Sequence, residues 1–188
     1  MENERSAAGF TRAGRGRTTG GGLDLTVGTG VLAMDAERAP RPGDRPPDRW
    51  TVYTDGACRG NPGPGGWAWA VPGGACDSGG EPHTTNQRME VRAALEALRS
   101  LPGPVTVVSD STYVVNCFRQ RWWVGWRRRG WRNSQGQPVA NRDLWEPLLD
   151  IALEPGRGVR FEWVKGHSGD PMNELVDRLA TEAADRGR

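Results

Sequence analysis

Cysteine, lysine and long apolar runs are scarce in this chain of 188 residues. Its three cysteines, Cys58, Cys76 and Cys117, show no C-x-x-C spacing, so they indicate neither a cysteine metal site nor a paired disulfide framework. No apolar run approaches the ~20 residues that cross a bilayer, and the N-terminus lacks the apolar core of a signal peptide. We therefore expect a cytoplasmic protein in a reducing environment, with no membrane partner.

Lysine occurs once, at Lys165, and the rest of the 25 basic side chains are arginines. The net charge is only +2. Because a GC-rich genome can produce the same bias, arginine content alone does not predict nucleic-acid binding. The positions of the arginines are more informative than their number.

Residues 1–48 differ in composition from the rest of the chain. They are rich in Gly, Arg, Pro and Asp, their charges nearly cancel, and they offer little apolar surface to offset the entropy of ordering. We predict a disordered N-terminal arm that serves as a linker, with Met34 as an alternative initiator. A tail that binds nucleic acid or a partner is the other interpretation. Residues 49–188 suit one globular domain.

Strands and helices alternate in the pattern of this domain, which is typical of an α/β fold. The first strand is expected to end near Asp55, because residues 56–66 consist largely of Gly, Pro and Asn and so indicate a loop. The apolar run at residues 105–109 is of the kind buried on both faces of a mixed or parallel sheet. Strands are predicted at residues 49–54, 66–71, 75–83, 105–109 and 159–164, and helices at 85–101, 113–119 and 143–153 and from Pro171 onward.

Four acids stand at the ends or starts of these elements. Asp55 closes the first strand, Glu90 is expected in the first turn of the first helix, Asp110 follows the central strand, and Asp177 lies on the last helix. Each has an ordinary structural explanation: a turn cap for Asp55, the helix dipole for Glu90, a surface acid for Asp177. Asp110 is better placed, because ligand sites of open α/β sheets gather beyond the carboxyl ends of strands.

A basic, aromatic segment covers residues 119–132, with six arginines, four tryptophans and no acid. One interpretation is a solvated basic face whose tryptophans belong to the core. The interpretation that we favour is contact with nucleic acid, in which arginine binds phosphate and flat rings lie against sugar or base.

Several motifs, in one order along the chain, resemble those of the type 1 ribonuclease H family. They are YTDG at residues 53–56, GNPGPGG at 60–66, TTNQRME at 84–90, SDS at 109–111, WVKGH at 163–167, and Asn173-Glu174 followed by Asp177. The resemblance covers about residues 49–186. It implies a ribonuclease H-like fold, with a five-stranded mixed sheet flanked by helices and a basic handle at about residues 119–140. It also implies endonucleolytic cleavage of the RNA strand of RNA:DNA hybrids, with 5′-phosphate and 3′-hydroxyl products.

The resemblance makes Asp55, Glu90, Asp110 and Asp177 catalytic metal ligands. Four clustered carboxylates repel one another unless protons or cations intervene, and hard oxygen ligands favour Mg²⁺, with Mn²⁺ as the alternative. Two ions about 3.5 to 4 Å apart can activate a water and stabilise the leaving oxygen at phosphorus. Our hypothesis gives Asp55 the position between the two ions.

His167 alone would be an exposed loop residue, but Gly166 and Gly169 give its loop freedom to move over a site. By resemblance it assists proton transfer or product departure and binds no metal tightly. His83 has no such context and is expected to be structural.

Substrate contacts are likewise implied by the resemblance. The backbone from Cys58 to Gly60, with Asn61, Asn86 and Gln87, is placed at the minor groove, where the 2′-hydroxyl distinguishes RNA from DNA. Thr85 and Arg88 would hold a phosphate of the DNA strand, and Trp122, Trp126 and the handle cations Arg127, Arg128 and Arg129 would follow that strand. Thr112 stands where the family often has Gln, which weakens the expectation of a contact there.

Two other functions stay open at this point, an exonuclease of the same broader fold and a non-catalytic module that binds hybrids. The loop at residues 60–66 and the basic handle argue against the exonuclease. The presence of all four acids argues against the binding module. The expected partner is an RNA:DNA hybrid, and the chain is expected to act as a monomer.

Overall fold

The computed structural model of this protein describes residues 48–186. The predicted N-terminal arm, residues 1–48, lies outside the described residues except for Asp48, and so does the alternative initiator Met34.

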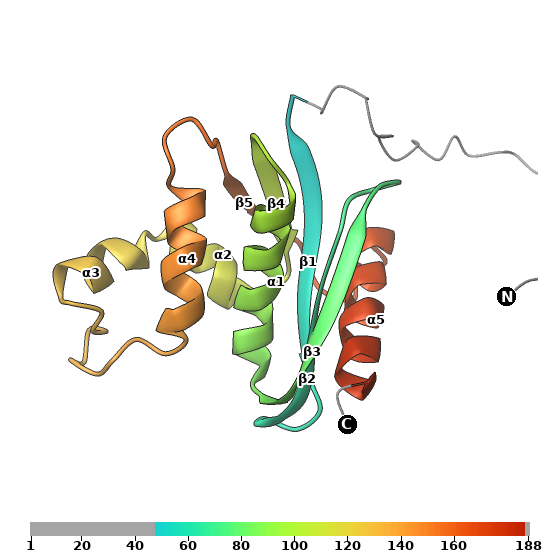
Figure 1. Ribbon diagram of the computed structural model, residues 1–188, viewed down its shortest axis with the longest axis horizontal. Helices are drawn as coiled ribbons and strands as arrows, with labels where there is room; N and C mark the ends of the chain where they lie inside the picture. The colour runs from blue at the N-terminus through green and yellow to red at the C-terminus, as the bar shows by residue number, and fades with distance from the viewer. Residues whose placement is uncertain (1–47, 187–188) are drawn as a thin grey trace, which may run out of the picture. The chain divides into compact units, whose positions relative to one another are not determined.

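One five-stranded mixed sheet forms the centre of the domain, in the spatial order β3-β2-β1-β4-β5 (Figure 1). The first three strands pair antiparallel, whereas β4 pairs parallel with both β1 and β5. The sheet predicted from the resemblance is therefore confirmed. Its strands are β1 (Trp50–Cys58), β2 (Gly63–Ala70), β3 (Cys76–Thr84), β4 (Val105–Ser109) and β5 (Arg160–Trp163).

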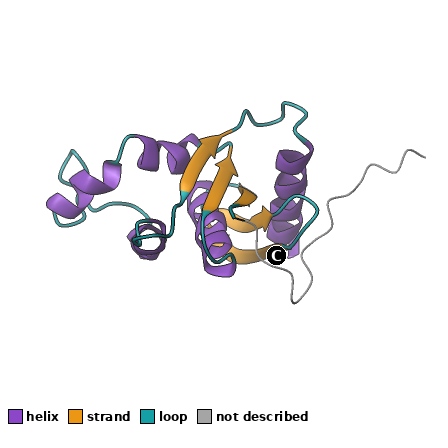
Figure 2. Ribbon diagram, turned by 90° about the horizontal axis from the view of Figure 1, so that it is seen from above, coloured by secondary structure: helices purple, strands orange, loops and turns teal. Residues whose placement is uncertain are grey.

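Helices cover both faces of the sheet (Figure 1, Figure 2). They are α1 (Asn86–Ser100), α2 (Thr112–Arg119), α3 (Trp122–Arg128), α4 (Arg142–Ala152) and α5 (Pro171–Arg186). On one face, α1 and α4 pack into the larger apolar core, which includes Val52, Leu95 and Trp145. On the other, α5 packs on Ala68 and Ala70 through Val176 and Ala180.

Side-chain caps begin three of these helices close to the predicted residues. The Thr85 hydroxyl accepts a hydrogen bond from the Arg88 amide at the start of α1, and Ser111 caps α2 in the same way. The Asp170 carboxylate accepts from the amides of Met172 and Asn173 and so caps α5. Such caps satisfy amides that have no partner within the helix.

The first strand is longer than predicted, because β1 continues through Asp55 to Cys58 and β2 already begins at Gly63. The expectation of a loop from residue 56 to 66 is therefore wrong, and the connection is only residues 59–62. Gly56 and Gly66 pair within the sheet, and their missing side chains let helices approach closely. A Cβ at Gly66, for example, would lie 2.2 Å from the carbonyl oxygen of Ala180 in α5.

Within residues 48–186, none of the helices has the length and apolar character required to cross a membrane.

Candidate active site

The parallel pairing of β1 with β4 places two of the predicted acids side by side. Tyr53 is the last residue of β1 in register with β4, opposite Val108. Two residues further along each segment stand Asp55 and Asp110, at the edge where β4 ends and β1 continues. The adjacency of these two acids thus follows from strand register.

Glu90 reaches the same place because α1 packs directly on β1 at Gly56. A Cβ at Gly56 would lie 2.3 Å from the Glu90 amide nitrogen and 2.5 Å from the Met89 carbonyl carbon, so no other residue fits without a shift of the backbone. Glu90 lies four residues after Asn86, in the second turn of α1. The prediction of a first-turn acid favoured by the helix dipole is therefore wrong, and its position follows from this close approach.

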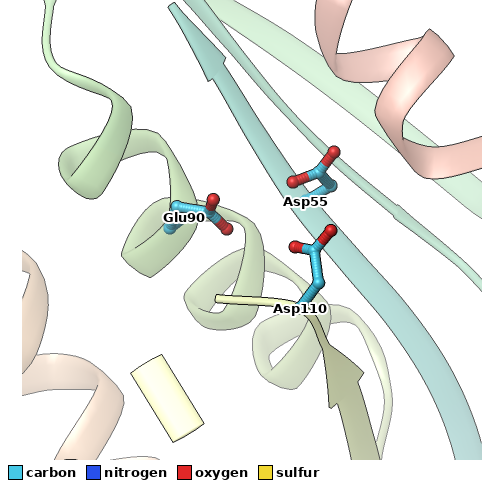
Figure 3. Close-up of side chains that lie close together, drawn as sticks. All are labelled: Asp55, Glu90 and Asp110. Atoms are coloured by element: carbon cyan, nitrogen blue, oxygen red, sulfur yellow. The ribbon is translucent and has the colours of Figure 1, made fainter. Parts of the chain in front are cut away.

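Asp55, Glu90 and Asp110 point toward one another from a strand, a helix and a strand end (Figure 3). Each offers an oxygen, and these oxygens all lie within 4.8 Å of one another. Asp55 is 5% exposed and Glu90 is 7% exposed. Asp177 and His167 line the same pocket of about 310 Å³, so the structure brings together all five predicted catalytic residues.

Burial and mutual repulsion make this cluster costly to ionise. Burial, then the charge of Asp110, raises the pKa of Asp55 to about 8, although the Gly56 amide, which donates to Asp55 Oδ1 at 2.8 Å, opposes the shift. Burial, then Asp55 and Asp110, also raises the pKa of Glu90 well above its ordinary value. Among the described residues, no arginine, lysine or histidine forms an ion pair with these three carboxylates.

The cluster fits a divalent cation. Glu90 Oε2 is buried and has no hydrogen-bond partner, which leaves an acceptor that a metal ion would satisfy. The available ligand atoms are carboxylate oxygens, the donors that hard cations such as Mg²⁺ and Mn²⁺ prefer.

Three neighbouring residues position Asp110, a role that the sequence did not indicate for any of them. Asn173 Nδ2 donates to Asp110 Oδ2 at 3.2 Å, and the Trp163 indole donates to the Asp110 carbonyl at 3.1 Å. A Cβ at Gly166 would lie 2.5 Å from Asp110 Oδ2, so this glycine also leaves room for the carboxylate. All three belong to motifs that carry the family resemblance, which is the only signal that could have found them.

His167 lies at the mouth of the pocket on an exposed loop, in a left-handed backbone conformation with φ of 50°. Ser168 Oγ donates to the Lys165 carbonyl at 2.6 Å across the same loop. His83 is exposed on β3 and does not line the pocket.

Two of the residues expected at the minor groove lie beside the acids. Cys58 and Asn86 line the pocket, and Asn86 Nδ2 donates to Glu90 Oε1 at 3.3 Å. Asn61 Oδ1 accepts from the Asn86 amide at 3.2 Å, which ties the loop after β1 to the start of α1. Gly60 in that loop has φ of 84°, which favours glycine, and Gln87 is exposed.

Thr85 and Arg88, expected to hold a phosphate, already have protein partners. The Thr85 hydroxyl caps α1. Arg88 makes two hydrogen bonds to the Asp143 carboxylate, one of them 2.9 Å, and an ion pair of 3.4 Å with Glu81. The hydrogen bonds from Arg88 lower the pKa of Asp143. A phosphate at Arg88 would therefore replace or share these partners.

The handle divides its tryptophans between the core and a second pocket. Trp126 is 8% exposed and meets Trp145 edge-on at 5.6 Å, yet it also lines a hollow of about 370 Å³ together with Trp122 and Arg129. Arg127 pairs with Asp150 at 2.8 Å and Arg129 donates to the Arg132 carbonyl. Arg128 is exposed. The buried ring of Trp126 and the exposed arginines fit a solvated basic face whose tryptophans belong to the core, and contact with nucleic acid stays a prediction.

Comparisons with known proteins agree with this architecture. The RNase H family model matches residues 47–185. Ribonuclease H of a Thermus thermophilus strain is 53% identical over 144 residues, which cover 74% of this chain and 86% of that protein. Ribonuclease H of Nitratidesulfovibrio vulgaris strain DP4 is 50% identical over 141 residues, which cover 72% of this chain and 89% of that protein.

A solved structure also shares the fold. The crystal structure of LC9-RNase H1, described as a type 1 RNase H with the type 2 active-site motif, superposes with a TM-score of 0.63 at 34% identity. The match covers 77% of this chain and 76% of that one. The family match spans the whole sheet and its flanking helices, including the four acids that meet at one pocket. The chain therefore belongs to the ribonuclease H family.

Proposed function

We propose that this ribonuclease H hydrolyses the RNA strand of RNA:DNA hybrids with two Mg²⁺ ions held by Asp55, Glu90, Asp110 and Asp177. Family membership makes the chain an endoribonuclease that depends on a divalent metal. The observation that carries the metal proposal is the convergence of Asp55, Glu90 and Asp110, whose oxygens lie within 4.8 Å of one another. When bound, the ions supply an activated water and stabilise the leaving oxygen, which gives 5′-phosphate and 3′-hydroxyl ends.

The acids and their neighbours provide a rigid set of ligands. Asn173 and Trp163 orient Asp110, and Asn86 orients Glu90 through hydrogen bonds of 3.1 to 3.3 Å. Oriented oxygens need little reorganisation when a cation binds, because their positions are set by packing before the metal arrives. In this proposal, Asp55 would help to hold both ions.

His167 moves a proton in the proposed reaction. Its imidazole lies on the exposed loop at the mouth of the pocket. One ring nitrogen exchanges a proton with the attacking water or with the departing 3′-oxygen, and the ring assists product departure. This role requires no tight metal contact.

Recognition of the hybrid is divided between two surfaces in this proposal. The backbone from Cys58 to Gly60, with Asn61, Asn86 and Gln87, selects ribose through its 2′-hydroxyl at the minor groove. The DNA strand lies along Thr85 and Arg88 and along the handle, where Trp122 and Trp126 provide apolar rings. Arg127, Arg128 and Arg129 supply handle cations that bind phosphate without reading the base sequence.

The proposed enzyme acts as a monomer in the cytoplasm. The five catalytic residues of one chain line a single pocket, so no residue from a second copy is needed to complete it.

Cleavage of an end-labelled RNA:DNA hybrid, with Mg²⁺ and with EDTA, tests the proposal. We expect metal-dependent internal cuts in the RNA strand, no cuts in RNA:RNA or DNA:DNA duplexes, and loss of cutting in Asp55→Asn. Glu182→Gln, which neutralises an exposed acid of α5, is the matched control and should cut normally. An Mn²⁺ series compares the two metals. Stepwise removal of end nucleotides would favour the exonuclease, and binding without cutting would favour the non-catalytic module.

A further inference from the structure

Arg59 brings a cation to a pocket whose wall is acidic. It follows β1 directly and lines the pocket together with Asp55, Asp110 and Asp177. Among the described residues that line this pocket, Arg59 is the only arginine or lysine. A nucleic-acid backbone that enters the pocket meets carboxylates that repel its phosphates, and Arg59 is placed to offset that repulsion.

The backbone of Arg59 is fixed on both sides. Its amide donates to the Pro64 carbonyl at 2.7 Å across the turn between β1 and β2. A Cβ at Gly63 would lie 2.1 Å from the Arg59 carbonyl oxygen, so the turn closes tightly against this residue. The side chain is therefore the part of Arg59 that can change position.

In this structure the guanidinium forms a two-pronged ion pair with Asp185 near the end of α5. Arg59 Nε donates to Asp185 Oδ1 at 3.0 Å, and Nη2 donates to Oδ2 at 2.9 Å. The two side chains are 43% and 45% exposed, and ion pairs this exposed are only weakly stabilising. Such a pair holds the guanidinium beside the pocket but can be exchanged for another anion at little cost.

We infer that Arg59 is a further substrate-binding residue, whose guanidinium exchanges Asp185 for a phosphate of the RNA strand next to the one that is cleaved. The inference rests on the proposed function, which places the cleaved phosphate at the four acids. The planar guanidinium fork that now holds a carboxylate fits a phosphate in the same two-pronged way. The RNA strand is favoured over the DNA strand because Arg59 shares the pocket with the acids, whereas Arg88 and the handle lie outside its lining.

A purely structural role is the competing explanation, in which the pair with Asp185 fastens the β1–β2 turn to α5. The two explanations differ for Asp185→Asn. If the pair is a fastener, loss of either partner lowers thermal stability and leaves affinity for the hybrid unchanged. If Asp185 restrains a phosphate-binding side chain, its loss strengthens binding of the hybrid, and only when Arg59 is present.

The test measures binding of a fluorescent RNA:DNA hybrid in EDTA, where no cleavage occurs, over a series of salt concentrations. We expect Arg59→Gln to weaken binding about fivefold and to reduce the slope of log K against log salt by about one. Asp185→Asn should tighten binding about twofold, and it should have no effect in the Arg59→Gln background. Arg178→Gln, an exposed cation of α5, is the control and should leave binding unchanged.

Hybrids with uncharged methylphosphonate linkages in one strand identify the strand. The difference between wild type and Arg59→Gln should vanish when the RNA strand is uncharged and persist when the DNA strand is uncharged; the reverse would overturn the RNA-strand assignment. Equal affinity and equal salt slope for wild type and Arg59→Gln would overturn the inference as a whole. Failure of wild type to cut the hybrid would instead defeat the proposed function, so the two failures are distinguishable.

Discussion

The carboxylate cluster and the basic handle hold opposite charges in opposite ways. In the cluster, Asp55 and Glu90 are almost fully buried and repel Asp110. In the handle, rings pack inward while cations such as Arg128 face solvent. The cluster therefore depends on exact distances between its side chains, whereas the handle depends on the number of its charges.

Backbone contacts set the distances in the cluster. Gly56 lets α1 approach β1, and Gly166 leaves room for the Asp110 carboxylate. Charge brought together by packing has a high free-energy cost until a proton or a cation neutralises it. One neutral substitution in the cluster should therefore change chemistry and stability together.

Aromatic contacts hold the handle, and its arginines stay exposed on the surface. The ring centroid of Trp126 lies 6.3 Å from that of Trp122 and 5.6 Å from that of Trp145, and the second contact joins α3 to α4. Exposed cations contribute to phosphate binding in roughly equal, salt-dependent steps. Loss of one handle cation should therefore weaken binding slightly and leave the chemical step intact.

The largest expected effect is that of Asp110→Asn in the cluster. The change keeps the shape of the side chain and removes the charge that holds the metal, so we expect cleavage to slow at least ~1000-fold, about 4 kcal/mol in the barrier. Single-turnover cleavage at saturating hybrid measures it, with Glu182→Gln as the control. A rate within tenfold of wild type would show that Asp110 is not needed for metal binding.

The second effect is a gain in stability, whereas the first is a loss of activity. The pKa of Asp55 rises from 3.8 to about 8 on folding, so in metal-free solution the folded protein retains a proton that the unfolded chain has lost. The free energy of unfolding therefore falls as pH rises between these values. Asp55→Asn removes this penalty and should gain ~2 kcal/mol at pH 8, or ~8 °C in melting temperature, with little gain near pH 4.

Thermal melts in EDTA at pH 4, 6 and 8 measure this gain. Mg²⁺ should stabilise wild type more than Asp55→Asn and so narrow the difference. Equal melting temperatures for the two proteins at pH 8 in EDTA would mean that the cluster is not strained by its charge.

The third effect is that of His167→Ala, on the exposed loop that lines the pocket beside the cluster. Because the imidazole assists proton movement and holds no ion, turnover should fall about tenfold while KM stays constant. Added imidazole should restore part of the rate, since the loop is open to solvent. His83→Ala is the control. A loss as complete as that of Asp110→Asn would contradict the division of roles between acid and histidine.

Sequence motifs located the four acids and the order of elements. The rule that a glycine-rich segment forms a loop failed at residues 56–66. Residues 56–66 resemble a loop in composition, and yet Gly56 and Gly66 are strand residues that admit α1 and α5. A glycine that turns the chain and one that admits a neighbouring backbone leave the same local pattern. The register that places Asp55 beside Asp110 depends on pairing across 55 residues and could come only from the family's topology.

Long-range partners were also beyond prediction from the sequence. Arg88 and Asp143 lie 55 residues apart, and nothing local indicates that they pair. The helix α3 has only seven residues, too few to show which of its tryptophans is buried, although Trp126 is. Asn173 belongs to a motif of the family resemblance, but its hydrogen bond to Asp110 is visible only in the folded structure.

The smallest expected effect is that of a single handle cation. Arg128→Gln removes one exposed charge that faces solvent on α3, so KM for the hybrid should rise about twofold to threefold near 0.1 M salt while kcat is unchanged. Arg99→Gln is the matched control, because Arg99 is an exposed arginine in the last turn of α1, outside the handle, and its removal should leave KM unchanged. The difference between the variants should disappear at high salt, because exposed charges are screened there. A fall in kcat for Arg128→Gln would mean that the handle helps to set distances in the cluster, and the division between the two regions would no longer hold.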